Sequence, residues 1–222
     1  SGTQSTVTAG TSNYIAGVNA GNSIASGGNY NVAVGDEAGT ALTTGDNNVA
    51  VGYAALDATT TAGGNVAVGF NALTTNITGA DNTAVGYNTL PVNTVDGNTA
   101  FGANALNVNT SGTLNVAVGR NPLVANTTGG SNTAVGAYAL DANTTASYNT
   151  AVGQAALGAN TTGAGNTAVG QTALTATTTG SNNIGIGAGA GAAITTANNN
   201  TMVGYVAGDA TTTGANNTAL GH

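Results

Sequence analysis

The apolar and polar positions of this chain repeat every 17 residues, with a single step of 16. Each repeat opens with Asn-x-Ala-Val-Gly or a near variant, and the motif asparagines are Asn31, Asn48, Asn65, Asn82, Asn98, Asn115, Asn132, Asn149, Asn166, Asn183, Asn200 and Asn217. A unit this short cannot bury an apolar face alone, so each repeat is expected to be one coil stacked on its neighbours. The pattern predicts an all-β fold, a parallel β-solenoid of about 13 coils.

Two short strands and two turns are expected in each coil, numbered here from the motif asparagine as position 1. Positions 1 to 5 suit a strand, with the side chain at position 4, such as Val51 or Val135, pointing into the core. Leucine at position 9, such as Leu56 or Leu140, is expected to line the core from the other side. Positions 11 to 14, as in residues 142–145, suit a second strand because they include β-branched residues and alternate in size.

The repeat is regular over residues 31–222 and degenerate over residues 1–30. In the degenerate part Asn13, Gly17 and Gly27 fit positions 1, 5 and 15. Glycine at position 15 permits a turn with positive φ before the next motif. Because the repeat is unbroken, we expect a single elongated domain.

The first and last residues are expected to form an assembly interface, because both fall within a coil. Solenoids normally cover their terminal coils, since an unpaired strand invites the addition of another chain. The near-matching phase of the two ends predicts head-to-tail polymerisation through Ser1, Thr8, Gly10, Asn13, Asn217, Leu220 and His222. The alternative is that the chain is a piece of a longer fibre.

The composition argues against most other functions. Charged residues are 4% of the chain and Lys is absent, so we expect no nucleic-acid binding. No apolar run approaches the roughly 20 residues of a membrane helix, and the lack of Cys excludes thiolate metal sites. The stretch from Gly185 to Gly191 is rich in glycine but has no Lys or following helix, as a phosphate loop would. We expect no enzyme activity, no catalytic or metal site and no cofactor.

Several copies of the motif carry a resemblance. Asn82–Gly86, Asn132–Gly136 and Asn166–Gly170 read Asn-Thr-Ala-Val-Gly and resemble the coils of trimeric autotransporter adhesin heads. The longer segment Asn82–Leu90 is similar to repeat arrays of phage tail-fibre-like and bacterial surface proteins. The resemblance implies a β-roll on the outside of a cell or virion, trimeric in the adhesin family.

Threonine forms two repeated columns, at positions 13 and 14, such as Thr144 and Thr145. Adjacent residues face opposite ways, so only one column is expected to point outward. An outward threonine ladder resembles the ice-binding face of some antifreeze solenoids. The alternative is that threonine is simply a good neutral residue for stacking.

Seven Asn-x-Ser/Thr triplets are candidates for N-glycosylation. Most lie at position 12 and are expected to line one edge of the solenoid; they begin at Asn76, Asn109, Asn126, Asn143, Asn160, Asn199 and Asn216. An Asn- and Thr-rich repeat also produces such triplets by composition alone.

The sequence therefore predicts a structural subunit of an extracellular or cell-surface fibre, or of a virion fibre, that associates with copies of itself. Its partner is expected to be the same chain, joined end to end and also laterally or as a trimer. The alternative function is an adhesin or tail-fibre segment that binds a host, or an ice-binding solenoid, with surface glycans or ice as the ligand.

Overall fold

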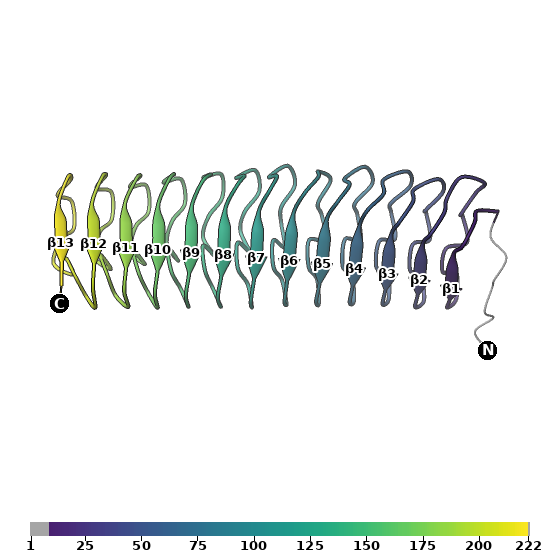
Figure 1. Cartoon of the computed structure of the whole chain (residues 1–222), viewed down its shortest axis with the longest axis horizontal. Helices are drawn as coiled ribbons and strands as arrows, with labels where there is room; N and C mark the ends of the chain where they lie inside the picture. The colour runs from purple at the N-terminus through teal and green to yellow at the C-terminus, as the bar shows by residue number, and fades with distance from the viewer. Residues whose placement is uncertain (1–8, 222) are drawn as a thin grey trace. The chain divides into compact units, whose positions relative to one another are not determined.

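The computed structural model describes residues 9–221, which contain thirteen short parallel strands and no helix (Figure 1). The strands are β1 (Tyr14–Ala16), β2 (Val32–Val34), β3 (Val49–Val51), β4 (Val66–Val68), β5 (Thr83–Val85), β6 (Thr99–Phe101), β7 (Val116–Val118), β8 (Thr133–Val135), β9 (Thr150–Val152), β10 (Thr167–Val169), β11 (Ile184–Ile186), β12 (Thr201–Val203) and β13 (Thr218–Leu220). The prediction of an all-β parallel solenoid is confirmed.

The chain divides into two compact units, one ending at Ser111 and the other beginning at Gly112. The first contains β1–β6 and the second β7–β13. Within each unit, every strand pairs with the strand of the next coil. The expectation of a single elongated domain stays a prediction.

Strand register confirms the 17-residue period. In the first unit Val49 pairs with Val66, and in the second Thr133 pairs with Thr150, so equivalent positions of successive coils lie above one another. The first coil differs, because Tyr14 pairs with Val32 and the coil therefore has one extra residue. The extra residue lies late in the coil, before Gly28, as the side-chain hydrogen bond of Asn13 shows.

The assignment of Gly27 to position 15 was wrong. In regular coils the motif asparagine donates from its side-chain amide to the carbonyl at position 15, as Asn132 does to Ala146 at 2.9 Å. In the first coil the side-chain amide of Asn13 donates instead to the carbonyl of Gly28, at 2.8 Å. Gly28 therefore occupies the place of position 15, one residue later than the spacing suggested.

The strand is shorter than expected and faces the other way. It covers positions 2 to 4, and position 3 points inward, as Ala134 does with no exposed surface. Val135 at position 4 is only partly buried, so the expectation that position 4 lines the core was wrong. The alanine column at position 3 is therefore part of the core.

Leucine at position 9 fills the remaining core space, as predicted. Leu140 and its equivalents are fully buried in most coils. The interior between this leucine and the strand is narrow: a Cβ added to Gly185, at position 3, would lie 2.8 Å from Cγ of Leu174 in the preceding coil. Beside leucine, position 3 is therefore limited to small residues, and the larger buried Ile15 and Met202 occupy position 3 only in coils that have glycine at position 9.

The second predicted strand, at positions 11 to 14, does not form. Asn143 and Ala146, at positions 12 and 15, are both buried, and a spacing of three does not match the two-residue alternation of a strand. The backbone is nevertheless bonded between coils: Thr127 N–H donates to the Thr144 carbonyl at 2.9 Å. This side of the coil is a stack of turns held by parallel hydrogen bonds.

Buried leucines adopt the left-handed backbone conformation, as Leu140 does at φ 51°. That region disfavours side chains with a Cβ by roughly 1–2 kcal/mol. Full burial of a leucine contributes about 1.5–3 kcal/mol and offsets the strain. The turn that closes each coil is therefore stabilised by packing more than by local preference.

Leu114 has the same strain without the burial, and this leads to a prediction. It lies at position 17 with φ 58° and is 65% exposed. Asparagine tolerates the left-handed region and occupies the same position at Asn182 with φ 57°. We expect Leu114→Asn to raise the free energy of unfolding by about 1 kcal/mol, measured by urea denaturation.

The matched control is Leu140→Asn, which makes the same exchange at a buried left-handed position. It is expected to lower stability, because the strain relieved is smaller than the apolar burial lost. A loss of stability on Leu114→Asn would contradict the prediction.

Candidate functional site

The motif asparagines form a buried ladder along each unit. Asn132 has no exposed surface; its N–H donates to Oδ1 of Asn115 at 3.0 Å, and its own Oδ1 accepts from Asn149 N–H at 3.0 Å. In the first unit Asn48 is placed in the same way between Asn31 and Asn65. The backbone N–H and Oδ1 of these asparagines are used between coils, and Nδ2 also bonds within the coil, as Asn132 does to the Ala146 carbonyl. The most regular motif of the sequence is therefore structural and offers no ligand a free group.

A second ladder lies at position 12. Nδ2 of Asn143 donates to Oδ1 of Asn126 at 2.8 Å, and Nδ2 of Asn160 donates to Oδ1 of Asn143 at 3.0 Å. The next coil has Thr177 instead, and its hydroxyl donates onward to the Ile194 carbonyl at 3.1 Å. Oδ1 of Asn160 is consequently left buried without a hydrogen-bond partner in the described chain.

Burial in this ladder limits the glycosylation candidates. The triplets at position 12 do not line an outer edge, because their asparagines have no exposed surface; these are Asn76, Asn109, Asn126, Asn143 and Asn160. A sugar attached to such an amide would have to displace the ladder. Asn199 and Asn216 lie at position 17 and are exposed, so the prediction remains open for these two.

Of the two threonine columns, position 14 is the outward one. Thr145 is exposed, whereas Thr144 is only partly so and its hydroxyl donates to the Thr161 carbonyl of the next coil at 3.2 Å. Thr127 and Thr161 bond forward in the same way, at 3.0 and 3.1 Å. The position-13 column therefore serves stacking.

The outer face of the strands is a surface that the sequence reasoning missed. We call it the sheet face: the side chains at positions 2 and 4 of each strand. They are valine, threonine and other uncharged residues in every strand, and they are partly or fully exposed. The available signal was that position 3 is almost always alanine while position 2 varies between valine and threonine. A column that has alanine in most coils is typical of a crowded interior.

Aromatic side chains stack at position 6 in the first unit. Tyr53 and Phe70 lie with ring centroids 5.3 Å apart, and Phe70 and Tyr87 lie 5.5 Å apart, all three exposed. In the second unit Arg120 lies over the ring of Tyr138 at 5.6 Å. The three stacked rings cover one another's faces, so they stabilise the turn rather than offer a flat platform to a planar ligand.

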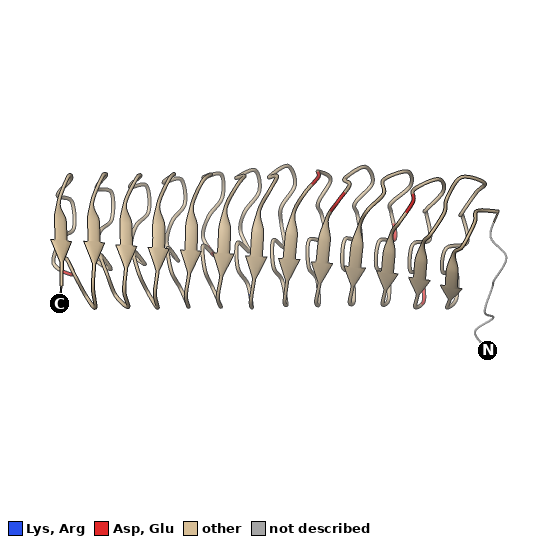
Figure 2. Cartoon of the chain, viewed as in Figure 1, with Lys and Arg blue, Asp and Glu red and all other residues tan. Residues whose placement is uncertain are grey.

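Charge is concentrated in the turns of the first unit (Figure 2). That unit has six carboxylates and no Lys or Arg, a net charge of -6; the second has two carboxylates and Arg120, a net charge of -1, which completes the total of -7. Several of these carboxylates accept backbone N–H groups of the preceding coil, as Asp46 does from Asn29 at 2.6 Å and Asp96 from Ala80 at 2.8 Å. They contribute to stacking.

Across residues 9–221, no group of three or more His, Cys, Asp or Glu side chains is arranged to hold a metal ion. Within the same range, no helix could span a lipid bilayer.

Asp141 is the one carboxyl group with a clear shift among the described residues. Burial raises its pKa above the ordinary value, and hydrogen bonds from the backbone N–H groups of Asp141 and Ala142 partly oppose the effect. Because the pKa is higher in the folded state, protonation favours folding. This contribution is complete below the ordinary aspartate pKa and is lost as the pH rises through the raised one.

A pH prediction follows from this shift. Asp141→Asn removes the desolvated charge, so the variant is expected to be more stable than the original protein at neutral pH. The difference in the free energy of unfolding should shrink as the pH falls through the window between the two pKa values. Denaturant titrations from neutral to acid pH measure it. A difference that is constant over this range would contradict the assignment.

The predicted assembly residues lie in different environments. Ser1, Thr8 and His222 fall outside the described residues. Asn13 and Asn217 belong to the motif ladder, where Asn217 N–H donates to Oδ1 of Asn200 at 2.9 Å. Gly10 packs against the Gly28 carbonyl, and Leu220 lies on the sheet face with 75% of its surface exposed. Gly10 and Asn13 belong to the first unit, and Asn217 and Leu220 belong to the second.

No protein-family model, curated protein or solved structure matches this chain.

Proposed function

We propose that this protein is a structural subunit of an extracellular or virion fibre, built by stacking solenoid coils of successive copies head to tail. The observation that carries the proposal is that adjacent coils are bonded through equivalent groups at each step. The motif asparagine, the position-13 threonine and the strand each pair with their own counterparts in the next coil. A coil edge is therefore complementary to another coil edge of the same sequence.

The distribution of polar groups supports a structural role over a catalytic one. Buried asparagines such as Asn132 and Asn149 have their hydrogen bonds satisfied between coils. Carboxylates such as Asp46 accept backbone N–H groups rather than facing one another. An enzyme site needs convergent groups with tuned pKa values, and the polar side chains described above, all within residues 9–221, do not provide one.

Electron microscopy of the purified protein at neutral pH tests the proposal. Head-to-tail stacking gives filaments whose length grows with protein concentration. Within the chain, the N–H at position 2 donates to the position-1 carbonyl of the next coil, as Thr201 does to Asn217 at 2.8 Å. Thr218 would make this bond to the stacked copy, so Thr218→Pro, which removes the N–H, is expected to shorten the filaments.

Thr218→Val is the matched control, because it keeps the N–H and the β-branched side chain. Filaments of unchanged length are expected for this variant. Particles of single-chain length at every concentration of the unmodified protein would overturn the proposal.

An ice-binding or host-binding segment is the second candidate. The exposed position-14 threonines, including Thr128, Thr145 and Thr162, favour it because they form a regular outward row. Thermal hysteresis in solution would support ice binding, and retention on immobilised cell-surface glycans would support an adhesin. Either activity should be lost when two of these threonines are replaced by lysine.

A further inference from the structure

We propose that the sheet face of β7–β13 is a lateral interface that binds the same face of a second copy of this chain. The face has two side chains per strand, at positions 2 and 4, and none is charged. At position 4 it is apolar throughout; Val152 is 37% exposed and Val169 is 38% exposed. A continuous apolar surface of this kind is typical of a protein interface.

Hydrogen bonding shows how the face can be covered. Strand backbones bond to neighbouring strands, so this flat surface offers side chains rather than a free backbone edge. In the described chain, the hydroxyls of Thr133, Thr150 and Thr167 make no hydrogen bond to other residues, in contrast to those of the position-13 column. Two facing sheets would bury the valines and leave the threonine hydroxyls free to pair across the interface.

The charge distribution permits a second copy as the occupant. Two chains of net charge -7 repel each other unless the contact excludes their carboxylates. In the second unit the carboxylates belong to Asp141 and Asp209, which lie at position 10 in the turns and not on the strands. Figure 2 shows the same separation, with the strands free of acidic residues.

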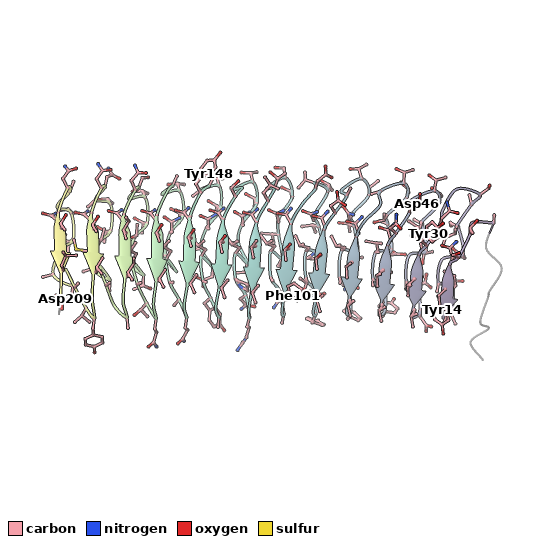
Figure 3. All side chains as sticks on the ribbon, viewed as in Figure 1. Tyr14, Tyr30, Asp46, Phe101, Tyr148 and Asp209 are labelled. Carbon is pink, nitrogen blue, oxygen red and sulfur yellow. The ribbon has the colours of Figure 1, made fainter. Side chains whose placement is uncertain are left out.

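The turns also carry the prominent Tyr148, which projects away from the strands (Figure 3).

Spacing supports the same occupant. Parallel strands repeat at about 4.8 Å, and opposed β-sheets pack at about 10 Å with their side chains interdigitated. Two copies have identical spacing, so a match between one pair of coils is a match between all pairs in the unit. A partner without this repeat would lose the fit after a few coils.

The area is sufficient for association. The valines and threonines of this face are mostly about a third exposed or less and present roughly 50 Å² or less each, so the two columns over seven strands offer at most roughly 700 Å² per copy, against about 800 Å² per partner for a standard interface and about 500 Å² for the smallest specific ones. The second unit alone is therefore large enough to pair.

Paired lysine substitutions test the interface. Val135→Lys with Val169→Lys places charge on the sheet face of two coils, and a lysine at a half-exposed site can extend into water in the single chain. Thr145→Lys with Thr179→Lys is the matched control, because it places the same charge in the same two coils at exposed turn positions. Light scattering after size-exclusion chromatography gives the mass.

The masses are compared in preparations that contain no filaments. We expect the original protein and the control to have masses of at least twice 20.9 kDa, and the sheet-face variant to have the mass of a single chain. Circular dichroism must show that the variant remains folded. A single-chain mass for the original protein, or equal dissociation of variant and control, would overturn the proposal. Thermal hysteresis of a single-chain species that is lost in the sheet-face variant but kept in the Thr145→Lys, Thr179→Lys control would instead assign the face to ice.

Cysteine labelling gives a second measurement, since the chain has no Cys of its own. Val152→Cys should react with a thiol reagent more slowly than Thr145→Cys, and should lose this protection in the Val135→Lys, Val169→Lys background. Equal reaction of Val152→Cys in both backgrounds would contradict lateral pairing. The inference is independent of head-to-tail stacking: Thr218→Pro changes the length of particles, whereas the sheet-face variant changes their width.

Discussion

Replacing Gly136 by alanine is expected to destabilise the second unit by about 3 kcal/mol or more, because two costs coincide at this residue. Its φ of 134° is a conformation that L side chains rarely adopt. An added Cβ would also lie 2.6 Å from the carbonyl oxygen of Gly153 in the next coil. That oxygen belongs to the backbone of another glycine at position 5, so it cannot move without shifting its own coil.

Gly158→Ala is the control in the neighbouring coil. Gly158 does not have a positive φ, and the nearest atoms to its added Cβ are the Ala155 carbonyl oxygen and Asp141 Oδ1, both at 3.3 Å. Its position 10 is occupied by Asp141 in the preceding coil, so a side chain fits there. This substitution is expected to change stability by less than about 1 kcal/mol. Urea denaturation followed by circular dichroism compares the two, and similar losses would show that the position-5 glycine is not special.

The second large effect concerns an exchange between positions 9 and 12 of the coil. Most coils have leucine at position 9 with asparagine or threonine at position 12, such as Leu174 with Thr177. Others have glycine at position 9 with a branched apolar residue at position 12, such as Gly191 with Ile194. A Cβ added to Gly191 would lie 2.8 Å from Leu174 and 3.1 Å from Ile194, so both residues reach the same interior volume.

A double-mutant cycle at Leu174 and Thr177 tests this shared volume. Leu174→Gly alone is expected to cost about 3–5 kcal/mol, because it opens a cavity. Thr177→Ile alone is expected to cost about 1–3 kcal/mol, because it overfills the coil and removes the hydrogen bond to Ile194. Together they rebuild the pattern of the next coil, so their combined cost should be lower than the sum by about 1–3 kcal/mol. Strictly additive losses would show that the two positions do not share the space.

The 17-residue period by itself predicted most of the fold. Because each coil is bonded to an equivalent coil, a residue such as Val49 can only pair with its counterpart Val66 if the stack is to continue. The leucine column at position 9 was also predictable, since a large apolar residue repeated in phase has to be buried somewhere in a solenoid. These conclusions needed only spacing and hydrophobicity.

The candidate surfaces were harder to predict. Burial of Asn143 could not be read from its Asn-x-Thr triplet, because asparagine is common both in exposed turns and in stacked amide ladders. The sequence likewise could not decide whether the column of Thr144 or that of Thr145 points outward. The hydrogen bond of Thr144 to the next coil decides it. Polar residues acquire their role here from the group above or below them, which lies in another repeat.

The sequence by itself determined that this protein is a stacked solenoid with a fixed repeat, because in-register columns of like residues satisfy both hydrogen bonding and packing. Only the tertiary structure decided which side of the strand is the core. Ala134 and Val135 are both apolar neighbours on a strand of three residues, so alternation places them on opposite faces without saying which face is inside. The decision came from position 9, where leucine on a left-handed turn fills the interior and leaves room for alanine but not for valine.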